Sequence, residues 1–181
     1  MDTYNKGLEY WNREENIFYH FAYDSENPTS ISNNLTLALA YDAQNRLWVG
    51  TSQGLCRYEG DGIFTRYTMD MHNPRSLPSS NIRWLHTSSD NCLWIATDSG
   101  GIAVYDEESD SFSHWTKKDG LISNSIFSMV EDNNKNIWAV SANGISIWDY
   151  TTKSWRQYLD HTRLRVSFAL KNRIVELSEV K

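Results

Sequence analysis

A short aromatic motif recurs three times along this chain at nearly constant intervals. It reads Leu-Trp-Val-Gly-Thr at 47–51, Leu-Trp-Ile-Ala-Thr at 93–97 and Ile-Trp-Ala-Val-Ser at 137–141, which places its tryptophans 46 and 44 residues apart. A glycine, an apolar residue and further aromatic residues follow each copy in step. A unit of this size cannot bury its apolar surface alone, so stacked neighbours must cover it. The repeat therefore predicts an array of small packed units.

The patterned segments within each unit are short and typical of β-strands. In the second unit they are rich in aromatic and β-branched residues, are bounded by Asn, Asp, Gly and Ser, and lie at 82–87, 93–97, 102–106 and 112–116. Four such strands in about 45 residues make one blade of a β-propeller. We therefore predict an all-β fold of β-propeller blades with four antiparallel strands each, three full blades plus a partial one.

The repeat divides the chain into two regions. We expect propeller repeats at 1–160, with a net charge of −9, and an off-pattern basic tail, with a charge of +3 and the pattern of a hairpin, at 161–181. A partial blade is expected at 3–34, because its positions match those of the later units at Thr3, Gly7, Leu8, Trp11, Phe18 and Phe21. The full blades are expected at 35–81, 82–125 and 126–160.

The motif tryptophans Trp48, Trp94 and Trp138 have a structural role in such a fold. Twisted sheets that pack face to face leave a gap, and one large flat side chain per blade fills it repeatedly. We expect these three residues to pack between blades, with ligand stacking as the alternative.

Composition and charge exclude several classes of protein. The net charge of −6 and the pI of about 5.3 argue against a nonspecific phosphate-binding surface, so we expect no nucleic-acid partner. Cys56 and Cys92 form no disulfide or metal pattern, and the five histidines show no ligand spacing, so no metal and no cofactor are expected. No apolar run approaches the roughly 20 residues of a membrane helix, and no signal peptide is visible.

Two motifs resemble chemical sites, but their context favours turns. Gly-Thr-Ser-Gln-Gly at 50–54 fits the nucleophile pattern of hydrolases, which requires a strand-to-helix elbow, whereas here it joins two predicted strands. Asp132, Asn134 and Asn136 alternate as in a calcium loop, yet the glycine and the glutamate of such a loop are missing. We interpret 132–138, like 42–48, as a hairpin between the first and second strands of a blade, and we predict no catalytic residue.

The residues of the second and third units resemble a known family. Leu-Trp-Ile-Ala-Thr at 93–97, Gly-Gly-Ile at 100–102, Tyr-Asp at 105–106 and Asn-Ile-Trp at 136–138 are similar to the two-component regulator propeller repeat. That repeat builds the periplasmic sensor region of hybrid two-component histidine kinases of the Bacteroidetes type, which control polysaccharide utilisation. The resemblance covers 3–160 and implies a periplasmic fragment of such a sensor that responds to oligosaccharides and has no kinase motifs of its own.

Candidate ligand-binding residues follow from how propellers recognise ligands, with side chains at strand ends and in the loops of one face. We expect the turns after second strands and the connections between units to form that face, a tryptophan to stack on a sugar ring, and one histidine to face the axial channel. The candidates are Arg75, Trp84, His86, Asp98, Ser99, Asn124 and Asn143. The alternatives are a core position for Trp84 and a water-exposed imidazole for His86.

Two other functions remain open. A propeller enzyme, a lyase or a glycosidase, would use His86 or His114 as a general base and would need an acid within reach of the same substrate. A truncated fragment would have no activity of its own.

The ends of the array pose a separate question, since an open stack leaves apolar faces that must be covered. Each chain has fourteen predicted strands, so two chains would supply the twenty-eight strands of a seven-bladed ring closed by a homodimer. Alternatively, a tail hairpin at 166–170 and 173–177 completes the partial blade, which gives four blades in one ring or in half of an eight-bladed dimer.

Overall fold

The computed structural model describes residues 5–158, 164–166 and 177–179. The regular elements in these ranges are β-strands, apart from one turn of 3-10 helix, η1, at Lys117–Asp119. Within the same residues, no helix has the length and apolar character needed to cross a membrane.

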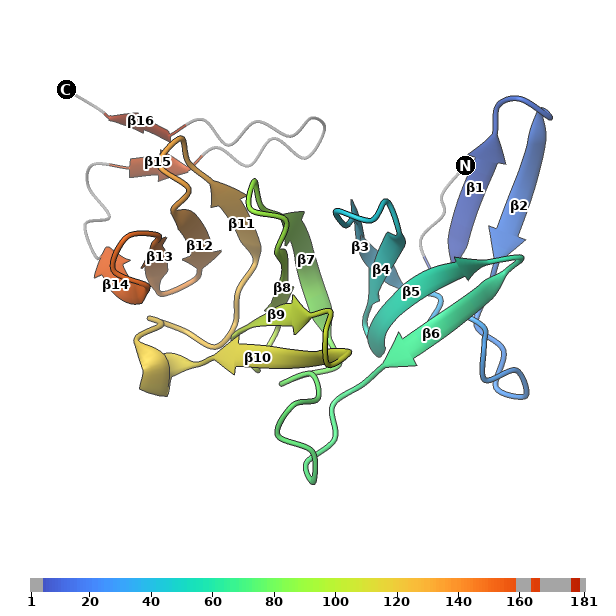
Figure 1. The fold of residues 1–181 in the computed structure, drawn as a ribbon, viewed down its shortest axis with the longest axis horizontal. Helices are drawn as coiled ribbons and strands as arrows, with labels where there is room; N and C mark the ends of the chain where they lie inside the picture. Colours follow the sequence, from blue (N-terminus) through green and yellow to red (C-terminus); the bar gives the residue numbers. More distant parts are fainter. Residues whose placement is uncertain (1–4, 159–163, 167–176, 180–181) are drawn as a thin grey trace.

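Three four-stranded sheets follow one another along the chain (Figure 1). The first consists of β3 (Thr36–Tyr41), β4 (Leu47–Thr51), β5 (Gly54–Gly60) and β6 (Ile63–Tyr67). The second consists of β7 (Ile82–Thr87), β8 (Leu93–Thr97), β9 (Ile102–Asp106) and β10 (Ser111–Trp115). The third consists of β11 (Ser128–Glu131), β12 (Ile137–Ser141), β13 (Gly144–Asp149) and β14 (Ser154–Tyr158). Each sheet pairs its strands antiparallel and in sequence order, so the predicted blades of an all-β propeller are confirmed.

Two smaller sheets lie outside this series. The partial blade consists of β1 (Leu8–Asn12) and β2 (Ile17–Phe21), which pair antiparallel. In the tail, β15 (Leu164–Val166) pairs with β16 (Leu177–Glu179) in a sheet that does not include β1 or β2. The predicted tail hairpin at 166–170 and 173–177 lies mostly outside the described residues, as does Thr3.

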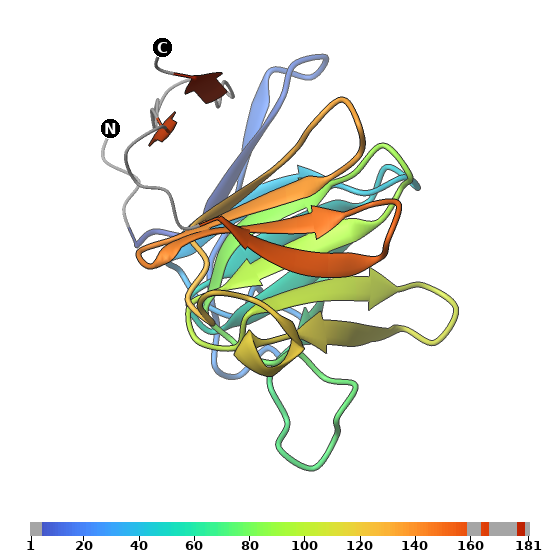
Figure 2. The same ribbon diagram turned by 90° about the vertical axis from the view of Figure 1, so that its left-hand side faces the viewer.

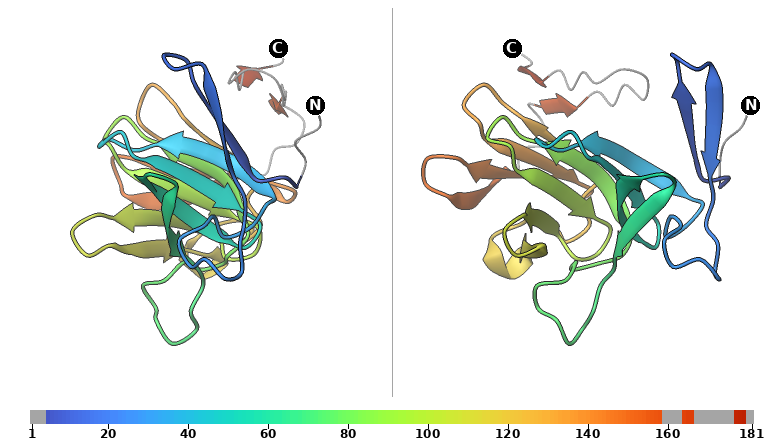
Figure 3. Two further views of the ribbon diagram at one scale, coloured as in Figure 1. Left: turned by 90° about the vertical axis from the view of Figure 1, so that its right-hand side faces the viewer. Right: turned by 45° about the vertical axis from the view of Figure 1, so that its right-hand side comes forward.

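The sheets are arranged face to face. Viewed from the β11–β14 end, they overlap one behind another, and viewed from the opposite end, β1–β2 lies in front (Figures 2 and 3). The first strands of successive sheets lie side by side, and the Thr87 hydroxyl on β7 donates a hydrogen bond to the carbonyl of Tyr41 on β3 (2.6 Å). The strands β3, β7 and β11 are therefore the inner strands of a fan.

Four aromatic residues at equivalent strand positions fill each of the two junctions between full sheets. At each junction one sheet contributes the tryptophan of its second strand and the last aromatic residue of its fourth strand, which we call the trailing pair. The next sheet contributes an aromatic residue from its third strand and one from its fourth, which we call the leading pair. The first junction joins Trp48 and Tyr67 to Tyr105 and Phe112, and the second joins Trp94 and Trp115 to Trp148 and Trp155.

Ring distances show how closely these residues pack. The centroid of Trp48 lies 4.8 Å from that of Tyr105 in the next sheet, and Trp94 lies 6.1 Å from Trp148. Trp48 is fully buried and Trp94 is buried, whereas Trp138 in the last sheet is partly buried. The expectation that motif tryptophans pack between blades is therefore confirmed for the first two.

Each motif tryptophan is held by the hairpin that precedes it. The indole N–H groups of Trp48 and Trp138 donate to Oδ2 of Asp42 (2.7 Å) and of Asp132 (2.8 Å), respectively. Both carboxylates also accept backbone N–H groups inside their own turns. The pairing of β3 with β4 and of β11 with β12 confirms that 42–48 and 132–138 are hairpins, and the Asp132 carboxylate points into its own turn.

We predict that the position of a motif tryptophan in the array decides how much it stabilises the fold. Trp94→Ala should lower the free energy of unfolding by about 3–5 kcal/mol, since it empties a junction filled by three other tryptophans. Trp138→Ala should cost clearly less in dilute solution, because no aromatic ring among the described residues packs against it. Urea unfolding followed by circular dichroism measures both, and equal losses would contradict the role of the junction.

A second prediction concerns the Asp42 carboxylate. Burial alone would raise the pKa of Asp42, but hydrogen bonds from Trp48 and Arg46 outweigh this effect and hold the pKa below its ordinary value. A carboxyl group with a lowered folded-state pKa stabilises the protein above its unfolded pKa, and this contribution disappears as the pH falls through the folded-state pKa. Asp42→Asn should therefore cost about 1–3 kcal/mol at pH 7 and progressively less below about pH 4.

Denaturant unfolding at pH 7 and pH 3 measures this difference. The control is Asp61→Asn in the exposed β5–β6 turn, which should change stability by no more than about 0.5 kcal/mol at either pH. A cost for Asp42→Asn that does not change with pH would show that the charge of Asp42 is not what matters.

Candidate functional site on the loop face

The turns after second strands and the connections between sheets lie on one face of the array, which we call the loop face. Backbone hydrogen bonds join them: Ser52 N–H donates to the carbonyl of Leu35 (3.1 Å), and Asp98 N–H donates to that of Asn81 (3.0 Å). These bonds tie each turn to the connection that leads into the inner strand of its own sheet. The loop face is therefore a fixed surface, as expected from the propeller pattern.

A cluster of polar side chains lies on this face where the second and third sheets meet. The Arg83 guanidinium donates to Oδ1 of Asp98 through Nη2 (2.7 Å) and Nε (3.0 Å), and Ser125 Oγ donates to the same oxygen (3.4 Å). Ser99 Oγ donates to Ser79 Oγ (3.2 Å). We call these five residues, from β7, the β8–β9 turn and two connections, the axial loop cluster.

The cluster is accessible to a ligand. The side chains of Arg83 and Asp98 are 41% and 35% exposed, and both Arg83 bonds go to one carboxylate oxygen, so Asp98 Oδ2 can accept from a ligand. Nearby, the Oδ1 atom of Asn81 is buried and has no hydrogen-bond partner among the described residues. The site therefore combines an exposed charge pair, hydroxyl groups and an unpaired amide oxygen.

An aromatic side chain adjoins the cluster on the inner strand. Trp84 follows Arg83 on β7 and is 39% exposed. Its cross-strand partner is Ala96, a core residue of the junction with the third sheet, so Trp84 lies on the side of β7 that faces β11. The core position considered for Trp84 does not describe this partly exposed ring.

His86 lies two residues after Trp84, on the same side of β7. Its Nε2 atom is 3.8 Å from Oε2 of Glu131 on β11, and Glu131 in turn accepts the N–H (2.7 Å) and the hydroxyl (2.6 Å) of Ser89. Burial lowers the pKa of His86 because it disfavours the imidazolium, and the Glu131 carboxylate opposes that shift only in part. His86 is thus a neutral and largely buried imidazole at pH 7, not a water-exposed one.

The remaining candidates lie apart from the cluster. The side-chain oxygen of Asn124 accepts a hydrogen bond from Lys117 N–H (2.7 Å), which stabilises the connection that contains both residues. Asn143 is exposed in the β12–β13 turn of the third sheet. Arg75 lies at the outer rim, in an ion pair with Asp106 (2.9 Å).

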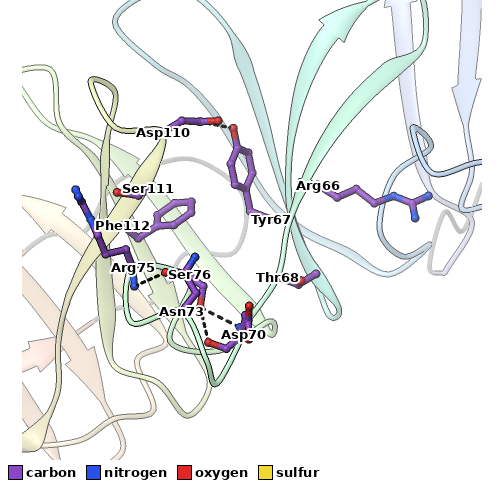
Figure 4. A pocket seen from close by; sticks show the side chains of 10 residues that line it. All are labelled: Arg66, Tyr67, Thr68, Asp70, Asn73, Arg75, Ser76, Asp110, Ser111 and Phe112. Atoms are coloured by element: carbon purple, nitrogen blue, oxygen red, sulfur yellow. Dashed lines mark hydrogen bonds between the residues drawn. The ribbon is translucent and has the colours of Figure 1, made fainter.

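Arg75 lines a cavity of about 200 Å³ at this rim, between β6 and β10. Figure 4 shows Tyr67 donating to Asp110 across its upper side, while Arg66 points away. Arg66 donates to the carbonyls of Asn27 (2.7 Å) and Ser30 (2.6 Å), so both arginines that line the cavity already have partners within the protein.

The structure therefore joins Asp98 and Ser99 in one cluster, with Trp84 next to Arg83 along β7, and leaves Arg75, Asn124 and Asn143 outside it. Arg83, Ser79 and Ser125 were not among the sequence candidates. One signal was present, because Arg83 occupies the repeat position that is apolar in the other units, as Leu37 and Phe127. Among the described residues, no group of three or more His, Cys, Asp or Glu side chains is placed to hold a metal ion.

We predict that the His86–Glu131 contact is detectable by titration. Glu131→Gln should lower the pKa of His86 further, because it removes the carboxylate that favours the imidazolium and leaves the effect of burial. Nuclear magnetic resonance titration of the imidazole C–H signals measures this change. A rise in the pKa of His86 in the variant would contradict the contact.

Comparisons with known proteins agree with this geometry. The family described as two component regulator propeller matches residues 30–53, 76–99 and 120–143. Each match begins in a connection on the loop face and ends in or just after the turn that follows the second strand. Among curated proteins, no sequence matches.

Solved structures show the same fold. The extracellular domain of a putative hybrid two-component system from B. thetaiotaomicron is 26% identical, with a TM-score of 0.66 over 73% of this chain and 19% of its own length. Virginiamycin B lyase from Staphylococcus aureus is 14% identical, with a TM-score of 0.62 over 85% of this chain and 48% of its own length.

PorZ, a surface component of the type-IX secretion system of Porphyromonas gingivalis, is 16% identical, with a TM-score of 0.59 over 76% of this chain and 20% of its own length. At their low identities, PorZ and the lyase show the fold alone, and this chain spans about a fifth of the length of the two-component domain. Each matched stretch covers the connection and the first two strands of one four-stranded sheet, so the chain carries three copies of the two-component regulator propeller repeat.

Proposed function

We propose that this chain is part of the extracellular, periplasmic sensor propeller of a hybrid two-component regulator and that its loop face binds an oligosaccharide. The observation that carries the proposal is the exposed Arg83–Asp98 pair with Trp84 beside it on the inner strand. The family match and the two-component extracellular domain among its structural neighbours support the sensor role.

The chemistry of the axial loop cluster suits a sugar. A carboxylate, a guanidinium and serine hydroxyls offer both donors and acceptors, which the many hydroxyl groups of a sugar require. A partly exposed indole offers a flat apolar surface with a polar edge, which suits the C–H face of a sugar ring. The backbone hydrogen bonds of the loop face hold these groups in place, so that little ordering is needed on binding.

The first test is direct binding of neutral and acidic oligosaccharide fragments, measured by isothermal titration calorimetry. For a fragment that binds, Trp84→Ala and Asp98→Ala should each weaken binding about tenfold or more, which corresponds to about 1.4 kcal/mol. The matched control is Arg75→Ala, which removes an exposed arginine from the rim cavity and should leave the affinity unchanged. Loss of binding in Arg75→Ala with none in Trp84→Ala would move the site to the rim.

An enzyme is the second candidate, because His86 is a neutral imidazole beside a carboxylate, as a general base requires. The other histidine considered, His114, lies on β10, the outermost strand of the same sheet, so the two side chains do not converge. Fragments that shift the unfolding temperature without product formation favour the sensor. Turnover that disappears in His86→Ala would favour the enzyme.

A further inference from the structure

The described array ends in two unlike faces, and each resembles one half of an internal junction. At both junctions between full sheets, the trailing pair of one sheet meets the leading pair of the next. The first sheet of the array offers a leading pair with no sheet before it, and the last sheet offers a trailing pair with no sheet after it among the described residues.

The leading pair of β1–β2 is Trp11 and Phe18. These rings stack with their centroids 5.7 Å apart and their planes 7° from parallel. They lie directly opposite each other in the strand register, on the side of the sheet away from Leu8 and Phe21, which face β3–β6. Trp11 is 46% exposed and Phe18 is 69% exposed, and β1–β2 forms the near end of the molecule in the left view of Figure 3.

The trailing pair of the last sheet is Trp138 and Tyr158. Both side chains lie on the face of β11–β14 opposite to Trp148 and Trp155, because the cross-strand pairs alternate between the two sides. The indole of Trp138 is fixed by its hydrogen bond to Asp132, just as Trp48 is fixed by Asp42. Trp138 is therefore held as Trp48 is, and Tyr158 lies on the same side of the sheet.

We propose that a second copy of this chain docks head to tail on these faces, so that Trp138 and Tyr158 of one copy pack against Trp11 and Phe18 of the other. The two faces lie at opposite ends of the array (Figure 1), so one copy cannot join its own pairs in this arrangement. Glu9 lies on the side of Trp11 and Arg156 on the side of Tyr158, and the Arg13 guanidinium lies over the Trp11 ring, 5.3 Å from its centroid. The contact joins two different surfaces, so it differs from a symmetric two-fold interface.

Cysteine cross-linking tests the geometry. At the first internal junction, the counterparts of Tyr158 and Phe18 are Tyr67 and Phe112, whose ring centroids are 5.4 Å apart. Phe18→Cys and Tyr158→Cys are made separately with Cys92→Ser, because Cys92 is a partly exposed free thiol whereas Cys56 is buried. Facing sheets lie about 10 Å apart, which is too far for a direct disulfide, so a short bis-maleimide reagent is used. The mixture of the two variants should form a cross-linked dimer, and each variant alone should not.

Two outcomes of cross-linking overturn the proposal. In a head-to-tail contact Phe18 faces Tyr158, so Phe18→Cys alone links less efficiently than the mixture. Efficient linking of that single variant would assign the face to a symmetric pair. A mixture that does not link excludes the docking of Tyr158 on Phe18.

Sedimentation equilibrium over a range of concentrations tests the energetics. Trp11→Ser and Phe18→Ser should each weaken self-association about tenfold or more, as expected for aromatic residues at the centre of an interface. The matched control is Tyr19→Ser, an exposed aromatic residue on β2 (40%, against 46% for Trp11) whose side chain lies on the other side of the sheet. It should leave association unchanged, and circular dichroism confirms that the variants fold.

A wild-type chain that sediments as a monomer at every concentration overturns the proposal. In that case, the reactivity of Tyr158→Cys toward a soluble thiol reagent identifies what covers the trailing face. Protection in the monomer assigns that face to residues of the same chain, and rapid reaction leaves it open.

Discussion

Aromatic packing between neighbouring sheets is the interaction on which this structure depends. In the described part of the chain, each four-stranded sheet buries its apolar side chains against neighbouring sheets, with help from connection residues such as Leu77 and Leu121. Two aromatic residues from each side fill the gap, and the buried clusters lie between sheets. The free energy of folding is therefore concentrated at the junctions, as expected for repeat proteins with nearest-neighbour contacts.

Polar groups orient this packing. The aspartate at the start of the first hairpin receives the indole N–H of Trp48 and two backbone N–H groups, which fixes the side chain that the next sheet must meet. In the second sheet Ser88 replaces the aspartate and receives the indole of Trp94 at a longer distance of 3.3 Å. The hairpin therefore holds Trp94 less strongly, and packing against three further tryptophans at the junction fixes its side chain.

The junctions between sheets are filled by apolar side chains, whereas polar side chains lie in the loops, which can vary without disturbing the junctions. The turns and connections of the loop face are held by backbone hydrogen bonds, so their side chains need not maintain the fold. This is why an exposed ion pair such as Arg83–Asp98 is tolerated at a repeat position that is apolar in the other sheets. The inner strands combine both roles, since Trp84 and His86 lie on one side of a strand whose other side is core.

The sequence by itself determined the blade count, the strand content and the face on which ligands are expected, because these follow from spacing and from local patterns. The ligand-binding roles expected for Asp98, Ser99 and Trp84 stay predictions. Only the tertiary structure decided that Arg83 pairs with Asp98, that His86 lies beside Glu131 of the next sheet, and that Arg75 is committed to Asp106 at the rim. These contacts join residues from different strands or different repeats, and a periodic pattern records what each unit contains but not which side chains of neighbouring strands and units meet.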